Sequence, residues 1–356
     1  MIPALVLTAG LATRLRPLSL VRAKAALPVA GDPLVRRILR WLASAGVTDA
    51  VLNLHHLPQT ITRVIGDGAR DGVRVRYSWE MPVLGSAGGP RRALPLLNTS
   101  PFLIVNGDTL TNVDIAAAVA HHEGSGALVT MVVVPNVEPA KYGGVVVEPD
   151  GTVSGFRATL STVEGSKVHA AEPSYHFIGV QVADARAFAS LPDNVPSESV
   201  AEHYPSLIAK RRGAVQAFVT SAEFFDIGTP ADYLSTSLLL GSRDSGFGIR
   251  MANSESRIPN PESRIPSPES PIPNPQSPLL LGARTRIADD ARVEDCVVWD
   301  DVDVEGGVTL RRCVVTDGVR VPAGSSWENA TIRVASGDLA AGERLVNGLA
   351  VGALSR

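Results

Sequence analysis

From residue 4 to about residue 240, short apolar runs alternate with amphipathic segments. The run Ala4–Leu7 predicts a buried strand, and the next segment predicts a helix with Leu34, Ile38 and Leu42 on one face, ended by Gly46. Further strands are predicted at 49–54, 73–78, 101–108, 127–134 and 176–182, with a hairpin over 143–156. This alternation is typical of an α/β domain in which a mixed, mostly parallel sheet lies between helices.

The pattern stops in a proline-rich stretch between residues 253 and 278. Three near-copies of one seven-residue unit, SRIPNPE, SRIPSPE and SPIPNPQ, follow one another. Proline at two or three places in each unit excludes a helix or a central strand, and few apolar residues remain to offset the entropy of ordering. We therefore predict an α/β domain over 1–240, a disordered Pro/Ser-rich linker over 241–280 and a further domain over 281–356.

After the linker, aliphatic residues recur at steps of five or six. They are Ile287, Val293, Val298, Val304, Leu310, Val315 and Val321. A shift of 17 residues superposes Cys296 on Cys313 and Asp300 on Asp317. Stacked coils of about three hexapeptides each explain this period, because one coil cannot bury its apolar edge alone. The two cysteines would stack in neighbouring coils as reduced thiols.

Composition narrows the function classes. The 356 residues have a formal net charge of -3, which gives no reason to expect a nucleic-acid partner. No apolar run has the length of a membrane span, and the first residues do not resemble a signal peptide, so we expect a cytoplasmic protein without a membrane partner. Two cysteines are too few for a disulfide scaffold, and neither their spacing nor that of the histidines matches a zinc site.

The candidate chemistry begins where the first strand ends. The stretch LTAGLATRLRPLSLVRAKAALPV runs from Leu7 to Val29 and combines a glycine turn with several cations. It is not the dinucleotide motif G-x-G-x-x-G, because Pro17 would interrupt the helix that must follow, and it is not a P-loop. A nicotinamide oxidoreductase is therefore disfavoured. A loop of backbone amides with a nearby guanidinium, Arg14, suits a triphosphate.

This stretch resembles the signature of sugar-1-phosphate nucleotidylyltransferases, L-x-A-G-x-G-T-R-L-x-P-L-T followed by P-K-x-L-x-P-V. The motifs LGSAGG, VNGD, KYGGVV, FIGVQV and FDIGTPADYL follow in the order of that family. The coils after the linker also resemble the short left-handed β-helix of the bacterial mannose-1-phosphate guanylyltransferase type. The resemblance implies a Rossmann-like nucleotidyltransferase domain followed by a short C-terminal left-handed β-helix.

The implied reaction joins a nucleoside triphosphate to a sugar 1-phosphate and releases pyrophosphate. Two carboxylates, Asp108 and Asp226, each follow an apolar strand on a glycine-bearing turn, where aspartate is also a common turn residue. The family's site implies the following roles for matching residues: catalytic, Arg14 and Lys24; nucleotide-binding, Leu7, Ala9, Gly10, Thr13, Gly85, Ala87 and Gly88; sugar-binding, Asn106, Gly143 and Gly179; ligands of Mg²⁺, Asp108 and Asp226.

Three departures from the family pattern bear on these expectations. Ala12 replaces the second glycine of the loop, Ala23 replaces the proline before Lys24, and the E-K-P segment that follows the hairpin is missing. A β-carbon at Ala12 is tolerable at negative φ and costly at positive φ. The glutamate of the missing segment normally accepts hydrogen bonds from sugar hydroxyls, so its loss weakens the assignment of the sugar.

We expect GTP and mannose 1-phosphate as substrates, giving GDP-mannose for cell-envelope polysaccharide. Uridylyl or thymidylyl transfer to N-acetylmuramate or glucose 1-phosphate is the alternative. A second alternative is a catalytically weak, regulatory homologue that binds a nucleotide sugar, although the presence of Arg14, Lys24, Asp108 and Asp226 together argues against it. A homo-oligomer formed through the β-helix is also expected from the resemblance.

Overall fold

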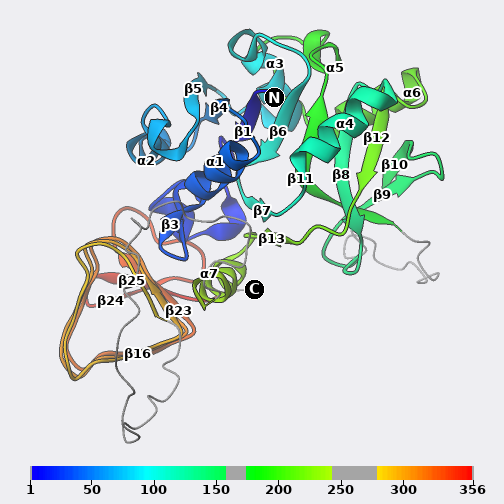
Figure 1. Cartoon of the computed structure of the whole chain (residues 1–356). Helices are drawn as coiled ribbons and strands as arrows, with labels where there is room; N and C mark the ends of the chain where they lie inside the picture. The colour runs from blue at the N-terminus through cyan, green and yellow to red at the C-terminus, as the bar shows by residue number, and fades with distance from the viewer. Residues whose placement is uncertain (1, 158–173, 243–278, 355–356) are drawn as a thin grey trace, which may run out of the picture. The chain divides into compact units, whose positions relative to one another are not determined.

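A computed structural model describes residues 2–157, 174–242 and 279–354 (Figure 1). The chain forms two compact units. The first contains the chain up to Pro28 and Asp32–Asp232, and the second contains Val29–Gly31 and the chain from Tyr233 onward. Within the described part of the chain, no helix is both long and apolar enough to span a bilayer.

The first unit is built on a nine-stranded sheet. Its helices are α1 (Leu34–Ser44), α2 (Pro58–Ile65), α3 (Gly85–Leu97), α4 (Ile115–Ser125), α5 (Arg186–Ala189) and α6 (Tyr204–Lys210). The sheet strands are β1 (Ala4–Leu7), β4 (Asp49–Leu54), β5 (Arg74–Trp79), β6 (Phe102–Asn106), β8 (Val129–Pro135), β9 (Gly144–Val147), β10 (Val153–Arg157), β11 (Tyr175–Ala183) and β12 (Val215–Val219). Two short pairs lie outside this sheet: β2 (Pro28–Val29) with β3 (Asp32–Pro33), and β7 (Thr109–Thr111) with β13 (Phe224–Asp226).

The main strand order is β10-β9-β11-β6-β1-β4-β5, with β8 beside β11 and β12 beside β8. β1 pairs in parallel with both β4 and β6, and β4 pairs in parallel with β5. β11 runs antiparallel to β6 and β8, and β9 and β10 form the predicted hairpin. The mixed, mostly parallel sheet of the sequence prediction is therefore confirmed.

Helices cover this sheet because their apolar faces match its apolar strands. In α1, Leu34, Ile38 and Leu42 are fully buried or nearly so, as predicted. α3 packs against β1 and β4, whereas α4 packs against β8 and β11. Asp114 caps α4 by accepting a hydrogen bond from the Ala117 amide at 3.0 Å. These contacts fix the carboxyl ends of β1, β4 and β6 at one edge of the sheet.

The second unit begins with part of α7 (Pro230–Ser242) and contains a parallel β-helix. Three sheets form its sides, and their triangular outline is visible in Figure 1. Their strands are β14 (Leu279–Leu281), β17 (Cys296–Val298), β20 (Val314–Val315) and β23 (Ala330–Val334); β15 (Arg286–Ile287), β18 (Asp303–Val304) and β21 (Arg320–Val321); and β16 (Arg292–Glu294), β19 (Thr309–Arg311) and β22 (Ser326–Glu328). The antiparallel strands β24 (Arg344–Val346) and β25 (Leu349–Ala353) follow, with β25 pairing β23.

The strand register of the β-helix confirms the 17-residue period. Arg286 pairs with Asp303, which pairs with Arg320, and the other two sheets show the same offset. The thiols of Cys296 and Cys313 are free and buried in adjacent coils, and the Cys313 amide donates to Cys296 Sγ at 3.3 Å. The predicted stacking of these cysteines is therefore confirmed.

Residues 243–278, which contain most of the predicted linker, lie outside the described residues. The residues on either side of them, Ser242 and Leu279, both belong to the second unit. Within that unit, Trp299 Nε1 donates a hydrogen bond to Tyr233 Oη of α7 at 2.9 Å, and both side chains are fully buried. Thus the first turn of α7 is joined to the β-helix by a buried contact.

Candidate active site

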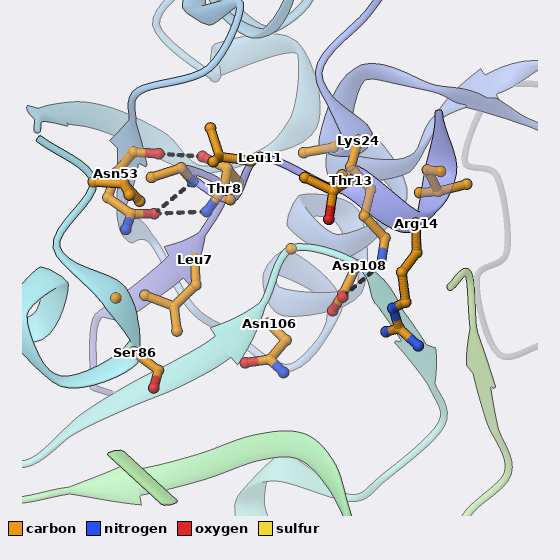
Figure 2. Close-up of a pocket in the computed structure, with 18 of the residues that line it drawn as sticks. Leu7, Thr8, Leu11, Thr13, Arg14, Lys24, Asn53, Ser86, Asn106 and Asp108 are labelled. Atoms are coloured by element: carbon orange, nitrogen blue, oxygen red, sulfur yellow. Dashed lines mark hydrogen bonds and ion pairs between the residues drawn. The ribbon is translucent and has the colours of Figure 1, made fainter. Parts of the chain in front are cut away.

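A pocket of about 500 Å³ lies where β1 and β6 end and α3 begins (Figure 2). Parallel strands bring their carboxyl ends to one edge of a sheet, where α/β folds bind ligands. The pocket is lined from Leu7 through Leu15 and by Lys24, Ala25, Asn53, Glu80, Val83, Gly85, Ser86, Asn106, Gly107, Asp108, Glu198 and Gly228. Leu7, Ala9, Gly10, Thr13, Arg14 and Lys24, all predicted site residues, therefore face one cavity.

Asn53 of β4 fixes the start of the loop that follows β1. Its Oδ1 accepts hydrogen bonds from the amides of Thr8, at 2.6 Å, and Ala9, at 3.3 Å, and its carbonyl accepts from Thr8 Oγ1. Asn53 Nδ2 donates to Glu80 Oε1 at 2.8 Å, while Glu80 Oε2 accepts from the Leu84 amide at 2.8 Å. One buried amide thus joins the loop to the segment that enters α3.

Sequence reasoning missed both Asn53 and Glu80. Asn53 is 3% exposed and Glu80 is 4% exposed, and burial raises the pKa of the Glu80 carboxyl. The signal in the sequence was a single asparagine inside the apolar run DAVLNL. A buried polar side chain requires partners, so its presence in a central strand pointed to a polar contact.

Ala12 occupies the left-handed region of backbone space, with φ of 48° and ψ of 47°. This conformation costs a residue with a β-carbon about 1–2 kcal/mol relative to glycine. The carbonyl of Ala12 is held by the Leu15 amide at 3.0 Å and by Ser19 Oγ at 2.9 Å. The loop therefore keeps a glycine-like backbone although the second glycine is absent.

Ala23, the other replacement in this stretch, is compatible with the proline it replaces. Its φ of -55° lies within the range that proline imposes. Its amide donates to Thr60 Oγ1 at 3.1 Å, a hydrogen bond that proline cannot make. The side chain of the next residue, Lys24, is held by Asp108.

Cations and carboxylates gather at the end of the pocket near Arg14 (Figure 2). Lys24 Nζ lies 2.6 Å from Asp108 Oδ2. Asp226 reaches the same cluster because β13 pairs with β7 and places Asp226 opposite Thr109, next to Asp108. Burial and, to a smaller extent, the Asp108 charge raise the pKa of Asp226, whereas Lys24 and Arg14 lower it.

Gly228 lies beside both Asp226 and Arg14. A β-carbon there would lie 3.3 Å from Asp226 Oδ2 and 3.6 Å from Arg14 Nη1. The four residues predicted as catalytic or metal-binding are thus brought together, from positions as far apart as 14 and 226. No group of three or more His, Cys, Asp or Glu side chains suited to a metal ion occurs among the residues that the structure covers.

The three predicted nucleotide-binding residues at the start of α3 differ in whether they line the pocket. Gly85, at φ of +75°, lines the pocket, and a β-carbon there would lie 2.6 Å from Glu198 Oε1. Ala87 is fully buried in the apolar core, and a β-carbon at Gly88 would lie 2.7 Å from the Val195 carbonyl oxygen. Ala87 and Gly88 therefore pack the helix and do not line this pocket.

Of the predicted sugar-binding residues, Asn106 lines the pocket. Gly179, at φ of +79°, makes room for it, because a β-carbon at Gly179 would lie 2.9 Å from Asn106 Nδ2. Gly143 is exposed and lines neither this pocket nor the larger one beside it. That second cavity, of about 910 Å³, shares Leu7, Ser86, Asn106 and Glu198 with the first.

Comparison with known families gives this site its context. Residues 3–242 match the nucleotidyl transferase family model. The chain belongs to the nucleotidyl transferase family. Residues 277–327 match a GlmU-like C-terminal hexapeptide model, in agreement with a left-handed β-helix. The fold of this nucleotidyl transferase and its class of reaction, transfer of a nucleotidyl group to a sugar 1-phosphate, are therefore as predicted.

Curated relatives include two sugar-nucleotide enzymes with long alignments. The chain is 26% identical over 312 residues to mannose-1-phosphate guanylyltransferase of Mycobacterium tuberculosis, covering 87% of this chain and 83% of that protein. It is 31% identical over 244 residues to mannose-1-phosphate guanyltransferase of Yarrowia lipolytica, covering 67% of this chain and 64% of that protein. N-acetylmuramate alpha-1-phosphate uridylyltransferase of Neisseria meningitidis is 46% identical over 117 residues, covering 32% of this chain and 50% of that protein.

Solved structures show the same fold. HddC from Yersinia pseudotuberculosis matches with a TM-score of 0.57 at 23% identity, over 67% of this chain and 100% of that chain. The structure of HddC complexed with GMP-PN matches with a TM-score of 0.56 at 22% identity, over 67% and 100% of the respective chains. At these identities the likeness concerns the fold alone.

Proposed function

We propose that this nucleotidyl transferase converts GTP and mannose 1-phosphate into GDP-mannose and pyrophosphate. The observation that carries the proposal is the convergence of Arg14, Lys24, Asp108 and Asp226 beside the loop after β1. The names of the Mycobacterium tuberculosis and Yarrowia lipolytica relatives support guanine and mannose as base and sugar.

The reaction needs positioned charge and no covalent nucleophile. A phosphate oxygen of the sugar 1-phosphate attacks the α-phosphorus, and the bond from that phosphorus to the α–β bridging oxygen breaks as pyrophosphate leaves. Both reactants are anions, so the barrier falls when cations neutralise them and hold them in line. We assign Arg14 to the β- and γ-phosphates, and Lys24 to the α-phosphate and the attacking phosphate.

Backbone amides of the loop add to this neutralisation. Space is open at Gly10, where an added β-carbon would have no neighbour within 4 Å, so a phosphate is able to approach the main chain. The bonds from Asn53 hold the amides of Thr8 and Ala9 in the loop's first turn. A preformed loop of this kind does not need to reorganise when charge develops.

Asp108 and Asp226 fit a magnesium ion that is shared with substrate phosphates. Mg²⁺ is commonly held in proteins by one or two carboxylates, with waters and phosphate oxygens completing the octahedron. Two aspartates next to one another match that donor set, and the site needs no third protein ligand. When bound, the ion would neutralise phosphate charge, while Lys24 would exchange its contact with Asp108 for substrate oxygens.

A second candidate is uridylyl transfer to N-acetylmuramate 1-phosphate. The 46% identity over 117 residues to the Neisseria meningitidis enzyme favours it. The absence of E-K-P also favours a sugar other than that of the typical family member, because the usual acceptor of sugar hydroxyl hydrogen bonds is missing. A cytoplasmic location and a homo-oligomer formed through the β-helix remain predictions.

Release of pyrophosphate tests both candidates. Full-length protein with Mg²⁺ would be offered GTP, UTP, dTTP and ATP, each with mannose, glucose and N-acetylmuramate 1-phosphates. We expect the highest kcat/KM with GTP and mannose 1-phosphate. A maximum at UTP and N-acetylmuramate 1-phosphate would replace the first candidate by the second, and no release with any pair would refute the enzymatic proposal.

A further inference from the structure

Lys141, the first residue of the motif KYGGVV, is a cation near the candidate active site that does not line the pocket. It lies in the segment that leads into β9, where the amides of Lys141 and Tyr142 both donate to the Glu138 carbonyl, at 2.9 and 3.0 Å. Its ammonium lies 3.5 Å from Asp232 Oδ1 and 5.1 Å from the centre of the Tyr142 ring. The Lys141 side chain is 41% exposed, whereas that of Lys24 is 15% exposed.

An aromatic cluster holds this segment beside the strand that carries Asp226. The Tyr142 ring lies 4.1 Å from the His176 ring of β11 and 5.8 Å from the Phe224 ring of β13, measured between ring centres. His176 and Phe224 are themselves 4.9 Å apart. Three packed rings thus fix the main chain next to Lys141 to the strand that ends at Asp226. The charge of Lys141 acts on Asp226, together with those of Lys24 and Arg14.

The carboxylate partner of Lys141 is a weak one. At 3.5 Å, the contact with Asp232 lies at the outer limit of a hydrogen bond. Asp232 is held elsewhere, since its Oδ2 accepts from the Thr229 amide and its own amide donates to Thr229 Oγ1, both at 3.1 Å. The ammonium can therefore exchange Asp232 for a phosphate while Asp232 stays in place.

The position of β9 indicates whether Lys141 would meet a phosphate of the nucleotide or the phosphate of the sugar. β9 pairs with β10, whose residues Ser154–Arg157 line the larger cavity of about 910 Å³. The loop after β1 lines the smaller cavity, and the two cavities meet at Asn106. If the nucleotide occupies the smaller cavity, the acceptor sugar enters from the larger one, on the side of β9.

We propose that Lys141 binds the phosphate group of the acceptor sugar 1-phosphate and positions it for attack on the nucleotide. This inference rests on the proposed function, but it does not depend on which sugar or base is used. Arg14 and the loop amides serve the leaving pyrophosphate, whereas Lys141 neutralises the attacking group. A third cation matters because two anionic substrates must meet in one site.

Steady-state kinetics of Lys141→Gln test the proposal, with whichever substrate pair the wild-type protein turns over. We expect KM for the sugar 1-phosphate to rise at least about tenfold, with less than a threefold change in KM for the nucleoside triphosphate and, in the reverse reaction, for pyrophosphate. Lys141→Arg should recover most of the loss. Arg292→Gln, at an exposed position of β16 in the β-helix, also removes one positive charge and should match wild type.

Two results would overturn the proposal. One is an unchanged KM for the acceptor, and the other is an equal or larger effect on the triphosphate or pyrophosphate. A binding measurement keeps this inference separate from the proposed function. The thermal shift produced by mannose 1-phosphate, glucose 1-phosphate and N-acetylmuramate 1-phosphate would be compared between wild type and Lys141→Gln. An inactive wild type would refute the proposed function, while a sugar-phosphate shift that persists in the variant would refute the role of Lys141.

Discussion

Left-handed backbone conformations occur both in the loop after β1 and in the β-helix, but they are supported differently. In the β-helix they recur every 17 residues, at Arg284, Asp301 and Gly318 and again at Asp295, Arg312 and Asn329. Neighbouring coils support them, as where Arg284 pairs with Asp301 and Arg312 Nε donates to Asn329 Oδ1 at 3.0 Å. The loop after β1 has a single such residue at its turn, Ala12, which is held by hydrogen bonds to its carbonyl.

This comparison distinguishes backbone strain that belongs to a repeated structural element from backbone strain at a candidate ligand site. In the β-helix, each left-handed corner is one of a series, and polar residues that tolerate this conformation, Asp and Asn, occupy several corners. In the loop, alanine has no such compensation, and the conformation is set by the surrounding site. Strain concentrates at functional sites, where the rest of the fold over-determines the backbone. The following substitutions test whether changes in the first unit mainly affect catalysis and changes in the β-helix mainly affect stability.

The largest expected effect is on chemistry and is confined to the first unit. Asp226→Asn and Asp108→Asn should each lower kcat/KM at least about 100-fold, because each removes a carboxylate that the proposed mechanism assigns to the metal ion. Thermal stability should stay within a few degrees of wild type. The matched control is Asp303→Asn, which removes an exposed carboxylate paired with Arg286 at 3.2 Å in the β-helix. A comparable loss of kcat/KM in Asp303→Asn would contradict the prediction that catalysis depends on the first unit alone.

The next effect is on stability and is confined to the β-helix. Leu310 is fully buried among the stacked coils, so Leu310→Ala should lower the free energy of unfolding by about 2–5 kcal/mol. Urea unfolding followed by Trp fluorescence measures this change. Thr309→Ala, at the exposed neighbouring position, should change the free energy by less than about 0.5 kcal/mol. A fall in kcat in proportion to the lost stability would show that the regions are not separable.

Lowering the pH should decrease the free energy of unfolding of the first unit, because His176 becomes protonated on unfolding. Burial lowers the pKa of His176 to about 4, whereas an unfolded histidine titrates near about 6.5. Because the folded state binds this proton less tightly, its contribution to stability is complete above about pH 6.5 and is lost as the pH falls toward 4. We expect a loss on the order of 2 kcal/mol between pH 6.5 and pH 5.

His176→Phe keeps an aromatic ring between Tyr142 and Phe224 and removes this titration. Unfolding in urea at pH 7.5 and pH 5 should then show a smaller pH dependence than wild type. Burial also lowers the pKa of His122 and of His203, so part of the dependence will remain. An unchanged pH dependence in His176→Phe would show that His176 is not buried in its neutral form.

The smallest expected effect comes from relieving strain in the loop. Ala12→Gly should raise the free energy of unfolding by about 1 kcal/mol, because glycine adopts the left-handed region without a steric penalty. Asp301→Gly makes the same backbone change in the β-helix but removes the pair with Arg284, so no gain is expected there. Differential scanning calorimetry compares the two. Equal gains would show that the loop and the corners carry the same strain.

The sequence was sufficient for the features that depend on local pattern. The buried strand Ala4–Leu7, the helix with Ile38 on its inner face and the 17-residue period all follow from the spacing of apolar residues. The carboxylate pair was accessible only through the family resemblance. Its physical basis is the pairing of β13 with β7, which joins residues more than 100 positions apart and leaves no local trace in the sequence.

The remaining features depend on packing. The contact from Asn53 to Thr8 requires β1 and β4 to be neighbours in a particular register. The φ angle of Ala12 is not encoded by alanine itself, since the surrounding hydrogen bonds decide it. The close packing of Gly88, where a β-carbon would lie 2.7 Å from the Val195 carbonyl oxygen, is likewise a contact that the sequence does not reveal.

The bond between Tyr233 and Trp299 has a consequence for the heptapeptide copies SRIPNPE, SRIPSPE and SPIPNPQ. Ser242 and Leu279, the described residues on either side of 243–278, both belong to the second unit, in which this bond ties α7 to the β-helix. The entropy of closing such a loop grows only with the logarithm of its length, so doubling it costs about 0.6 kcal/mol. We therefore expect that adding or removing one seven-residue copy changes the free energy of folding by less than about 0.6 kcal/mol, so that the number of copies has little effect on stability.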